Sequence, residues 1–454
     1  MNSTICENAL NKTTEIYKEL YITYGQNTRF REASIHNAGR KLKKVVDKLI
    51  ARDQYNYDLE VLEKNGHHTK VKNVHGKIGN YADFVSNSYN DLDFIEENRT
   101  KLLGYIRKEP LGSCISRKIA GRLTVHRELE EEIKDFLDYK TCILGTCGYI
   151  TQLSTLFALF NPGDVIFSDR YNHSSLIDGC RLSRAKMFFY RHLDYDHLEH
   201  TLKQNRHRFN AAGIVSDGVF STKGSMCNMD RINALSKAYG CVSIIDDTHG
   251  VCVVGNKGRG VLDFFDTKPD VLTGGFGKAF GAFGGFVVAN KSLGWIIDIF
   301  GRQNVNTSHL SPLSAAQALF NLRYYRRHHE QLSAELFGKL RIFNEALAGG
   351  GINCYECEDE GNGNYIHPIF CFYRKSEIET LKCMRRLLEE GILPSFFPPP
   401  VAPHPSLRFS LHRMLREKDI LKAANCLKTL DLFVEKGQTT ISNSKENWIK
   451  RNTT

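Results

Sequence analysis

Between residues 80 and 325, short apolar runs alternate with longer stretches in which apolar residues recur at helical spacing. One such stretch, HRELEEEIKDFL, places Leu129, Ile133, Phe136 and Leu137 on one helix face. Four apolar runs end on Asp or Gly: GDVIFSD (163–169), NAAGIVSD (210–217), GCVSIIDD (240–247) and DVLTGGFG (270–277). This alternation predicts an α/β fold, a parallel sheet with helices on both faces. In such sheets the functional residues follow the carboxyl ends of the strands.

The pattern changes on both sides of this region, which divides the chain into four expected parts. Residues 1–80 are polar and helix-prone and predict an N-terminal helical extension, and residues 81–325 form the large domain. Residues 326–438 predict a smaller α+β domain, in which consecutive prolines make FFPPPVAPHP an extended loop. Residues 439–454 form a polar tail.

Composition and charge narrow the class of protein. The chain has 454 residues, of which 41% are hydrophobic and 25% charged, as in globular proteins. Its net charge of +10 permits a nucleic-acid or other anionic partner without requiring one, and we expect no nucleic-acid partner. The basic run from Arg40 to Lys48 is typical of a solvated helix face. No apolar run approaches the roughly 18 residues of a membrane span, and no signal segment is evident. With 13 scattered cysteines, we expect a cytoplasmic protein with free thiols and no transmembrane segment.

The segment TGGFGKAFGAFGG (273–285) carries the strongest chemical signal. Its single lysine, Lys278, follows an apolar strand and lies among glycines, which allow the backbone to approach a ligand closely. A desolvated lysine amine in such a turn is a nucleophile. The segment does not match a phosphate-binding P-loop, because Ala279 follows the lysine where Ser or Thr is required.

A second segment, IIDDTHG (244–250), lies upstream. Its strand stops on Asp246, and His249 follows, which brings a carboxylate and an imidazole to the sheet edge. A buried carboxylate there would keep a ring nitrogen protonated and so create an electron sink. A helix-capping Asp beside a surface His is the alternative for an isolated pair, but the nearby Lys278 favours the chemical interpretation.

Together these segments resemble the α-oxoamine synthase family. The resemblance continues in order along roughly residues 75–435, through FVSNSYNDL (84–92), LGSCISRKIAGRLTVHRELEEEI (111–133), DRYNHSSLIDG (169–179), SDGVFSTKGSMCNMD (216–230), DDTHGVCVVGNKGRG (246–260) and PPPVAPHPSLRFSL (398–411). It implies a fold-type-I pyridoxal-phosphate transferase, with a mostly parallel sheet of the seven-stranded type in the large domain. It also implies a homodimer with active sites at the subunit interface.

The resemblance implies a role for each matching residue. Lys278 would bond the cofactor covalently and move the Cα proton, and Asp246 would pair with the ring nitrogen. His173 would stack on the ring and help to position the acyl carbonyl. The remaining cofactor contacts would be Gly148, Tyr149, Ser216, His249, Thr307 and Ser308, with Thr307 and Ser308 reaching the phosphate of the neighbouring subunit. Arg408 would bind the substrate carboxylate, and Asn87 and Arg117 would assist substrate binding.

Six positions, in four segments, depart from the family pattern. Gly275 stands where the family usually has a threonine that binds the phosphate, three residues before the lysine. Cys114 and Ile115 replace common glycines, Thr222 and Lys223 replace the usual Met-Asp, and Asp91 replaces a glycine. These departures leave the expected catalytic set intact.

The activity implied by the resemblance is the condensation of a small amino acid with an acyl-CoA, with loss of carbon dioxide. DDTHG and FGKAFG are most similar to the 8-amino-7-oxononanoate synthases, and serine palmitoyltransferase-like and glycine C-acetyltransferase-like activities are the alternatives within the family. A pyridoxal-phosphate aldolase or lyase without acyl-CoA is a further alternative, and so is a non-catalytic partner subunit or anion-binding module. No metal is expected, since the CxxC of Cys354 and Cys357 has no second ligand pair at suitable spacing.

Overall fold

The computed structural model describes residues 35–51, 59–352, 367–374, 376–397, 405–430 and 432. The chain divides into two compact units. Among the described residues, one unit contains 87–340 and 367–368, and the other contains the remaining segments before residue 87 and after residue 340. The expected domain boundaries at 80/81, 325/326 and 438/439 stay predictions.

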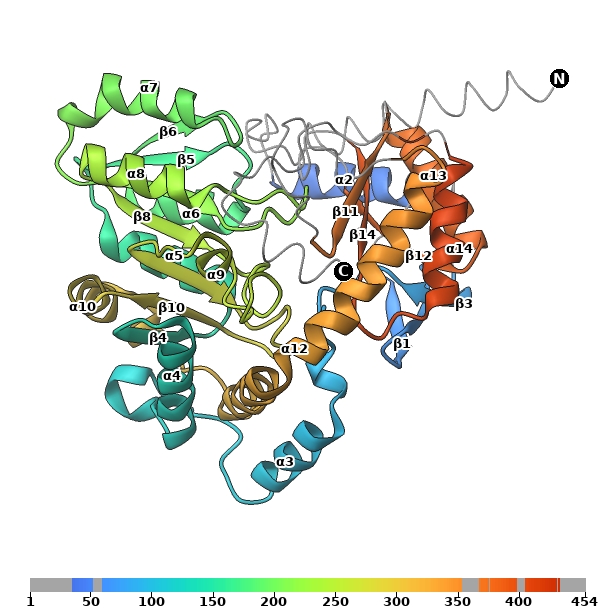
Figure 1. Cartoon of the computed structure of the whole chain (residues 1–454), viewed down its shortest axis with the longest axis horizontal. Coiled ribbons are helices and arrows are strands. Elements are labelled where there is room, and N and C mark those ends of the chain that lie inside the picture. Colours follow the sequence, from blue (N-terminus) through green and yellow to red (C-terminus); the bar gives the residue numbers. More distant parts are fainter. Residues whose placement is uncertain are drawn as a thin grey trace. The chain divides into compact units, whose positions relative to one another are not determined.

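The unit of residues 87–340 is built on a seven-stranded sheet of order β4-β10-β9-β8-β7-β5-β6 (Figure 1). The pairs from β9 to β6 are parallel, whereas β10 is antiparallel to both neighbours. The strands are β4 (Thr141–Gly145), β5 (Val165–Asp169), β6 (Lys186–Tyr190), β7 (Ala212–Asp217), β8 (Val242–Asp246), β9 (Val271–Gly275) and β10 (Gly285–Ala289). The prediction of a mostly parallel seven-stranded sheet is confirmed.

Helices cover this sheet and bury its apolar runs. The hydrophobic core joins strand residues such as Ile166, Val215 and Ile244 to Leu156 of α5 and Leu176 of α6. The helices are α3 (Glu96–Ile106), α4 (Thr124–Leu137), α5 (Gly148–Leu159), α6 (Ser174–Ser183), α7 (Tyr195–Asn205), α8 (Met229–Tyr239), α9 (Val261–Phe265), α10 (Lys291–Phe300), α11 (Gln303–Asn306) and α12 (Pro312–Ala348), with short turns η1 (Leu92–Phe94), η2 (Arg117–Gly121) and η3 (Arg206–Arg208). Strands β5, β7, β9 and β10 are buried along their whole length. This burial explains why their sequences are mostly apolar without the alternation of a half-buried strand.

The other unit contains two small sheets, of order β1-β2-β3-β12 and β11-β14-β13. Its elements are α2 (Ile35–Ala51), β1 (Glu60–Lys64), β2 (His68–Lys72), β3 (Ile78–Asp83), β11 (Ile369–Tyr373), α13 (Glu377–Glu389), β12 (Ile392–Leu393), β13 (Ser395–Phe397), β14 (Ser406–Ser410) and α14 (Glu417–Lys428). Within this unit, Phe84 and Phe409 pack edge to face with ring centroids 5.3 Å apart.

The structure corrects the expectation of a helical extension over residues 1–80. Residues 35–51 are helical, but residues 60–83 form three antiparallel strands. The outer strand, β1, is exposed at every position, so its sequence EVLEK lacks the alternation that marks a half-buried strand. No helix in the described ranges is long and apolar enough to span a membrane.

Candidate active site

Three of the expected residues come together at the carboxyl ends of the parallel strands. Asp246 is the last residue of β8, Lys278 follows β9 in a turn, and His173 is the N-cap residue of α6, shortly after β5. Burial raises the pKa of Asp246 and lowers that of His173. The charges of His173 and Lys278 each act on Asp246, and those of Asp246 and Lys278 each act on His173. The carboxyl ends of these parallel strands lie along one edge of the sheet, so the three residues share that edge, and their mutual charge effects agree with a common site.

A reciprocal set of hydrogen bonds holds His173 against the end of β7. Its backbone N–H donates to Asp217 Oδ2 at 3.0 Å, and the Asp217 N–H donates to Asn172 Oδ1 at 2.8 Å. The Asn172 amide nitrogen also donates to the Val215 carbonyl at 2.8 Å. Burial, followed by the charge of Asp246, raises the pKa of Asp217 well above its ordinary value and so favours its neutral form. The ring of His173 is therefore carried on a fixed backbone.

Gly148 and Tyr149 begin α5 beside this cluster. A Cβ built on Gly148 would lie 3.3 Å from the Cα of Gly275, so the helix start packs directly against the end of β9. The N-cap residue Cys147 makes no capping hydrogen bond through its side chain, which leaves the first N–H groups of α5 for an anion. The Tyr149 ring meets the His173 ring edge to face, with centroids 6.3 Å apart. Gly148 and Gly275 thus form a glycine floor, a surface without side chains where a phosphate could approach the backbone.

His249 is joined to Asn87 through a residue that sequence reasoning missed, Tyr89. The Tyr89 hydroxyl lies 2.7 Å from His249 Nδ1, and it also donates to Asn87 Oδ1 at 3.4 Å. Tyr89 is fully buried. The His249 carbonyl in turn accepts a hydrogen bond of 3.0 Å from His367 Nε2. These contacts fix the orientation of the His249 ring, and no local sequence pattern connects residues so far apart.

The residue next to Asp246 has a structural task of its own. Asp247 is fully buried and accepts a hydrogen bond of 2.8 Å from the Val261 N–H. Three glycines surround its carboxylate, and a Cβ on Gly218, Gly250 or Gly260 would lie 2.4, 2.1 or 1.8 Å from one of its oxygens. Asp247 therefore ties the loop that follows His249 to the end of β7.

Other expected cofactor contacts lie elsewhere or stay predictions. Ser216 pairs in register with Ile245, whereas Asp217 pairs with Asp246, so strand alternation directs Ser216 to the opposite face from Asp246. The Ser216 hydroxyl donates to the Asp217 carbonyl at 2.9 Å. The structure therefore does not place Ser216 with the cluster. Thr307 and Ser308 follow α11, where Ser308 is exposed and the Thr307 hydroxyl donates to Gln303 O at 3.0 Å.

Arg408 belongs to the other compact unit. It is buried in β14, and its guanidinium carbon lies 4.7 Å from the centroid of the Phe397 ring. Its role in binding the substrate carboxylate stays a prediction.

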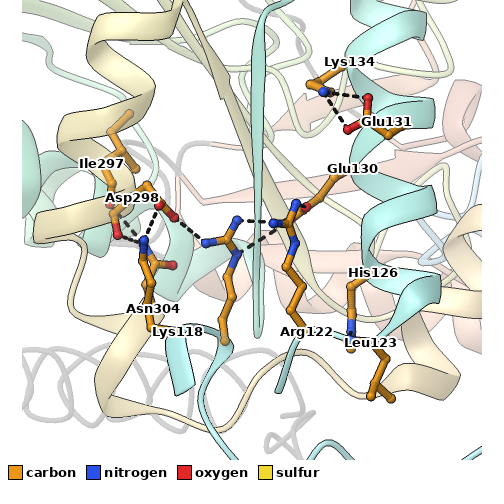
Figure 2. A network of polar contacts seen from close by, with 11 residues as sticks. Lys118, Arg122, Leu123, His126, Glu130, Glu131, Lys134, Ile297, Asp298 and Asn304 are labelled. Carbon is orange, nitrogen blue, oxygen red and sulfur yellow. Dashed lines mark hydrogen bonds and ion pairs between the residues drawn. The ribbon is translucent and has the colours of Figure 1, made fainter. Parts of the chain in front are cut away.

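The structure places Arg117 in a network of ion pairs. Its side chain is nearly buried and pairs with two carboxylates, those of Asp298 and Glu130, the latter at 3.3 Å. Glu130, on the buried face of α4, also binds Arg122, while Asp298 binds Lys118 (Figure 2). The Arg117 guanidinium therefore joins η2 to α4 and α10, and its expected role in assisting substrate binding stays a prediction.

Removing Glu130 from this network is expected to destabilise the fold. Glu130→Gln removes a buried charge from between two arginines, and breaking a buried ion pair costs about 3–5 kcal/mol. Denaturant unfolding at one fixed protein concentration measures the loss. Glu131→Gln is the matched control, because the neighbouring Glu131 is exposed, pairs with Lys134 and should contribute at most about 1 kcal/mol. Equal unfolding midpoints for the two variants would show that the network does not stabilise the fold.

Comparison with known proteins identifies the family. The family model "Aminotransferase class I and II" matches residues 81–425. An 8-amino-7-oxononanoate synthase of Coprothermobacter proteolyticus is 32% identical over 326 residues, which are 71% of this chain and 79% of that protein. The chain belongs to the α-oxoamine synthases of the class I and II aminotransferase family. Another α-oxoamine synthase, the 8-amino-7-oxononanoate synthase of Lysinibacillus sphaericus, is 30% identical and matches 85% of this chain and 97% of its own.

Solved structures of this family share the fold. Serine palmitoyltransferase of Sphingomonas wittichii superimposes with a TM-score of 0.78 at 22% identity, covering 88% of this chain and 98% of its own. 8-Amino-7-oxononanoate synthase of Francisella tularensis superimposes with a TM-score of 0.65 at 24% identity, covering 77% and 97%. The expected fold-type-I architecture is confirmed.

Within the described ranges, no group of His, Cys, Asp or Glu side chains has the arrangement of a metal site. The CxxC of Cys354 and Cys357 lies outside those ranges.

Proposed function

We propose that this α-oxoamine synthase condenses a small amino acid with an acyl thioester, with loss of carbon dioxide, as an 8-amino-7-oxononanoate synthase does. The gathering of Lys278, Asp246 and His173 at the carboxyl ends of the strands carries the proposal. The curated relatives with this name, which match most of the chain, support the choice within the family.

The residues present fit pyridoxal phosphate as the cofactor. The first N–H groups of α5 and the glycine floor at Gly148 and Gly275 suit the phosphate, and a Cβ on Gly148 would fill that floor. Asp246 would face the ring nitrogen, and His173 would stack on the ring. Lys278 lies in the turn after β9, where its amine can bond the aldehyde carbon.

When bound, pyridoxal phosphate supplies an electron sink for negative charge at the Cα of the amino acid. The chain's own residues prepare that chemistry. Asp246 would hold a proton at the ring nitrogen by pairing its carboxylate with that N–H, and its burial keeps water from competing for the contact. Lys278 takes the proton from Cα and therefore acts in its neutral form. His249, oriented by Tyr89, would bind the ring oxygen, and His173 would orient the acyl carbonyl.

We propose a homodimer with interface active sites as the working form. One face of α10 exposes a contiguous apolar set, in which Trp295 is 57% and Phe300 62% exposed. Exposed apolar patches of this kind mark interaction surfaces. Thr307 and Ser308, a few residues further on, would then reach the phosphate of the neighbouring subunit. Free thiols at every described cysteine agree with the cytoplasmic location that we also propose.

The test is an absorption spectrum of the protein after incubation with pyridoxal phosphate, followed by additions of glycine, alanine and serine. We expect a visible band that one amino acid shifts. Pimeloyl-, palmitoyl- and acetyl-CoA are then added, and release of the CoA thiol identifies the acyl donor. A shifted band without thiol release from any thioester would favour the aldolase or lyase alternative. A protein that stays colourless would favour the non-catalytic partner, although retention of Lys278 argues against it.

A further inference from the structure

Thr248 makes the closest contact that the structure gives to the carboxylate of Asp246. The Thr248 hydroxyl donates to Asp246 Oδ1 at 2.7 Å, and the Thr248 backbone N–H donates to the same oxygen at 3.2 Å. Asp246 is buried, so water does not compete for this oxygen. Two donors on one oxygen fix the rotation of the carboxylate about its Cβ–Cγ bond and hold Oδ1 in place.

Gly275 provides the room for this contact. A Cβ built on Gly275 would lie 3.3 Å from Cγ2 and 3.4 Å from Oγ1 of Thr248, at the tight limit of normal packing. A side chain at position 275 would therefore crowd Thr248 and require it to shift by a few tenths of an ångström. From the sequence, Gly275 is only a missing phosphate-binding hydroxyl, whereas the structure shows that Thr248 packs against this position.

The Thr248 hydroxyl cannot also replace the missing phosphate ligand. A hydroxyl carries one hydrogen, and that of Thr248 is donated to Asp246. Among the influences that favour the charged form of Asp246, the hydrogen bond from the Thr248 side chain is the largest. It opposes the burial that raises the pKa of this carboxyl.

We propose that Thr248 is a positioning residue that holds Oδ1 of Asp246 and so presents Oδ2 to the ring nitrogen of the cofactor. The absence of a side chain at Gly275 leaves the space that Thr248 occupies in this arrangement. The inference rests on the proposed function, since Asp246 must face the cofactor for Thr248 to act through it.

The test loads the full chain with pyridoxal phosphate labelled with ¹⁵N in the ring and follows the ring nitrogen by NMR as the pH rises. Thr248→Val keeps the shape of the side chain and removes the hydroxyl, whereas Thr248→Ser keeps the hydroxyl. In Thr248→Val we expect the ring nitrogen to lose its proton about one pH unit lower than in the wild type, a tenfold weaker proton affinity. Thr248→Ser should titrate like the wild type.

Two further variants keep the result specific. Thr273→Val removes a buried hydroxyl that donates to the Ile245 carbonyl at 3.3 Å, and it should leave the ring titration unchanged. Gly275→Ala retains Thr248 but crowds it, so its titration should shift in the same direction as that of Thr248→Val. This second route remains available if Thr248→Val fails to fold, as circular dichroism would show.

The outcomes separate the two proposals. Folded Thr248→Val or Gly275→Ala protein that titrates like the wild type overturns the role of Thr248 and leaves the proposed function standing. An equal shift in Thr273→Val overturns it as well, because the effect would then follow from any loss of a buried hydroxyl. A wild-type protein that takes up no cofactor overturns the proposed function, and this inference with it.

Discussion

Lys278→Ala is expected to abolish both turnover and the covalent attachment of the cofactor. One amine serves as the nucleophile and as the base at Cα, and loss of a general base alone lowers a rate by about 10²–10⁴-fold. Borohydride reduction followed by peptide mass spectrometry measures the covalent link directly. The wild type should carry a reduced pyridoxyl group on the peptide that contains Lys278, and the variant should carry none. Some cofactor should still bind through its phosphate at the start of α5.

Lys257→Ala is the matched control for this experiment. Lys257 is also a lysine in a glycine-rich loop of the same unit, but its side chain is exposed and lies outside the cluster. Its removal should leave turnover and labelling unchanged. Labelling of Lys278→Ala at another lysine, with turnover retained, would show that Lys278 does not hold the cofactor.

Asp246→Asn is expected to lower turnover by at least about 100-fold while preserving the fold. The neutral amide has almost the volume of the carboxylate but cannot hold a proton at a ring nitrogen, and one lost electrostatic interaction with a developing charge costs about 10²–10³ in rate. The amide also removes the charge that raises the pKa of His173. Steady-state kinetics, with the amino acid and acyl-CoA that the absorption and thiol-release assays identify, measure the effect, and cofactor absorbance confirms that the site remains loaded.

Asp230→Asn makes the same chemical change on the exposed first turn of α8 and should leave kinetics unchanged. If Asp246→Asn kept more than a tenth of wild-type turnover with the cofactor bound, Asp246 would not be the partner of the ring nitrogen. Another group would then have to hold that proton.

The large sheet could be predicted from the sequence because its central strands are buried on both faces. Runs such as VIFSD and GFVVA contain no charge until the strand ends, so their boundaries are visible in the sequence. Among the strands that escaped prediction, β6 and β1 are edge strands. β6 begins with exposed Lys186, and β1 is exposed throughout. An edge strand is defined by its neighbour, and that neighbour cannot be identified from a local pattern.

The sequence predicts those site residues that lie next to strand ends. It does not predict residues whose role depends on contacts with distant parts of the chain. The sequence marks Asp246 by its position at the end of β8, and Lys278 and His173 by their positions after β9 and β5. Tyr89 contacts His249 across 160 positions in the sequence, and Arg117 pairs with Asp298 across 181. No pattern of residue types reveals such partners, because they are chosen by the packing of the whole unit.

The glycines around Asp247 restrict the order in which this sequence could change over evolutionary time. No side chain fits at Gly218, Gly250 or Gly260 while the Asp247 carboxylate occupies the space between them. A shorter residue would have to replace Asp247 first, and that step alone would release the loop that follows His249. Substitution at any one of the four positions is therefore constrained by the other three. A protein that loses this arrangement must pass through an intermediate in which the site is less well held.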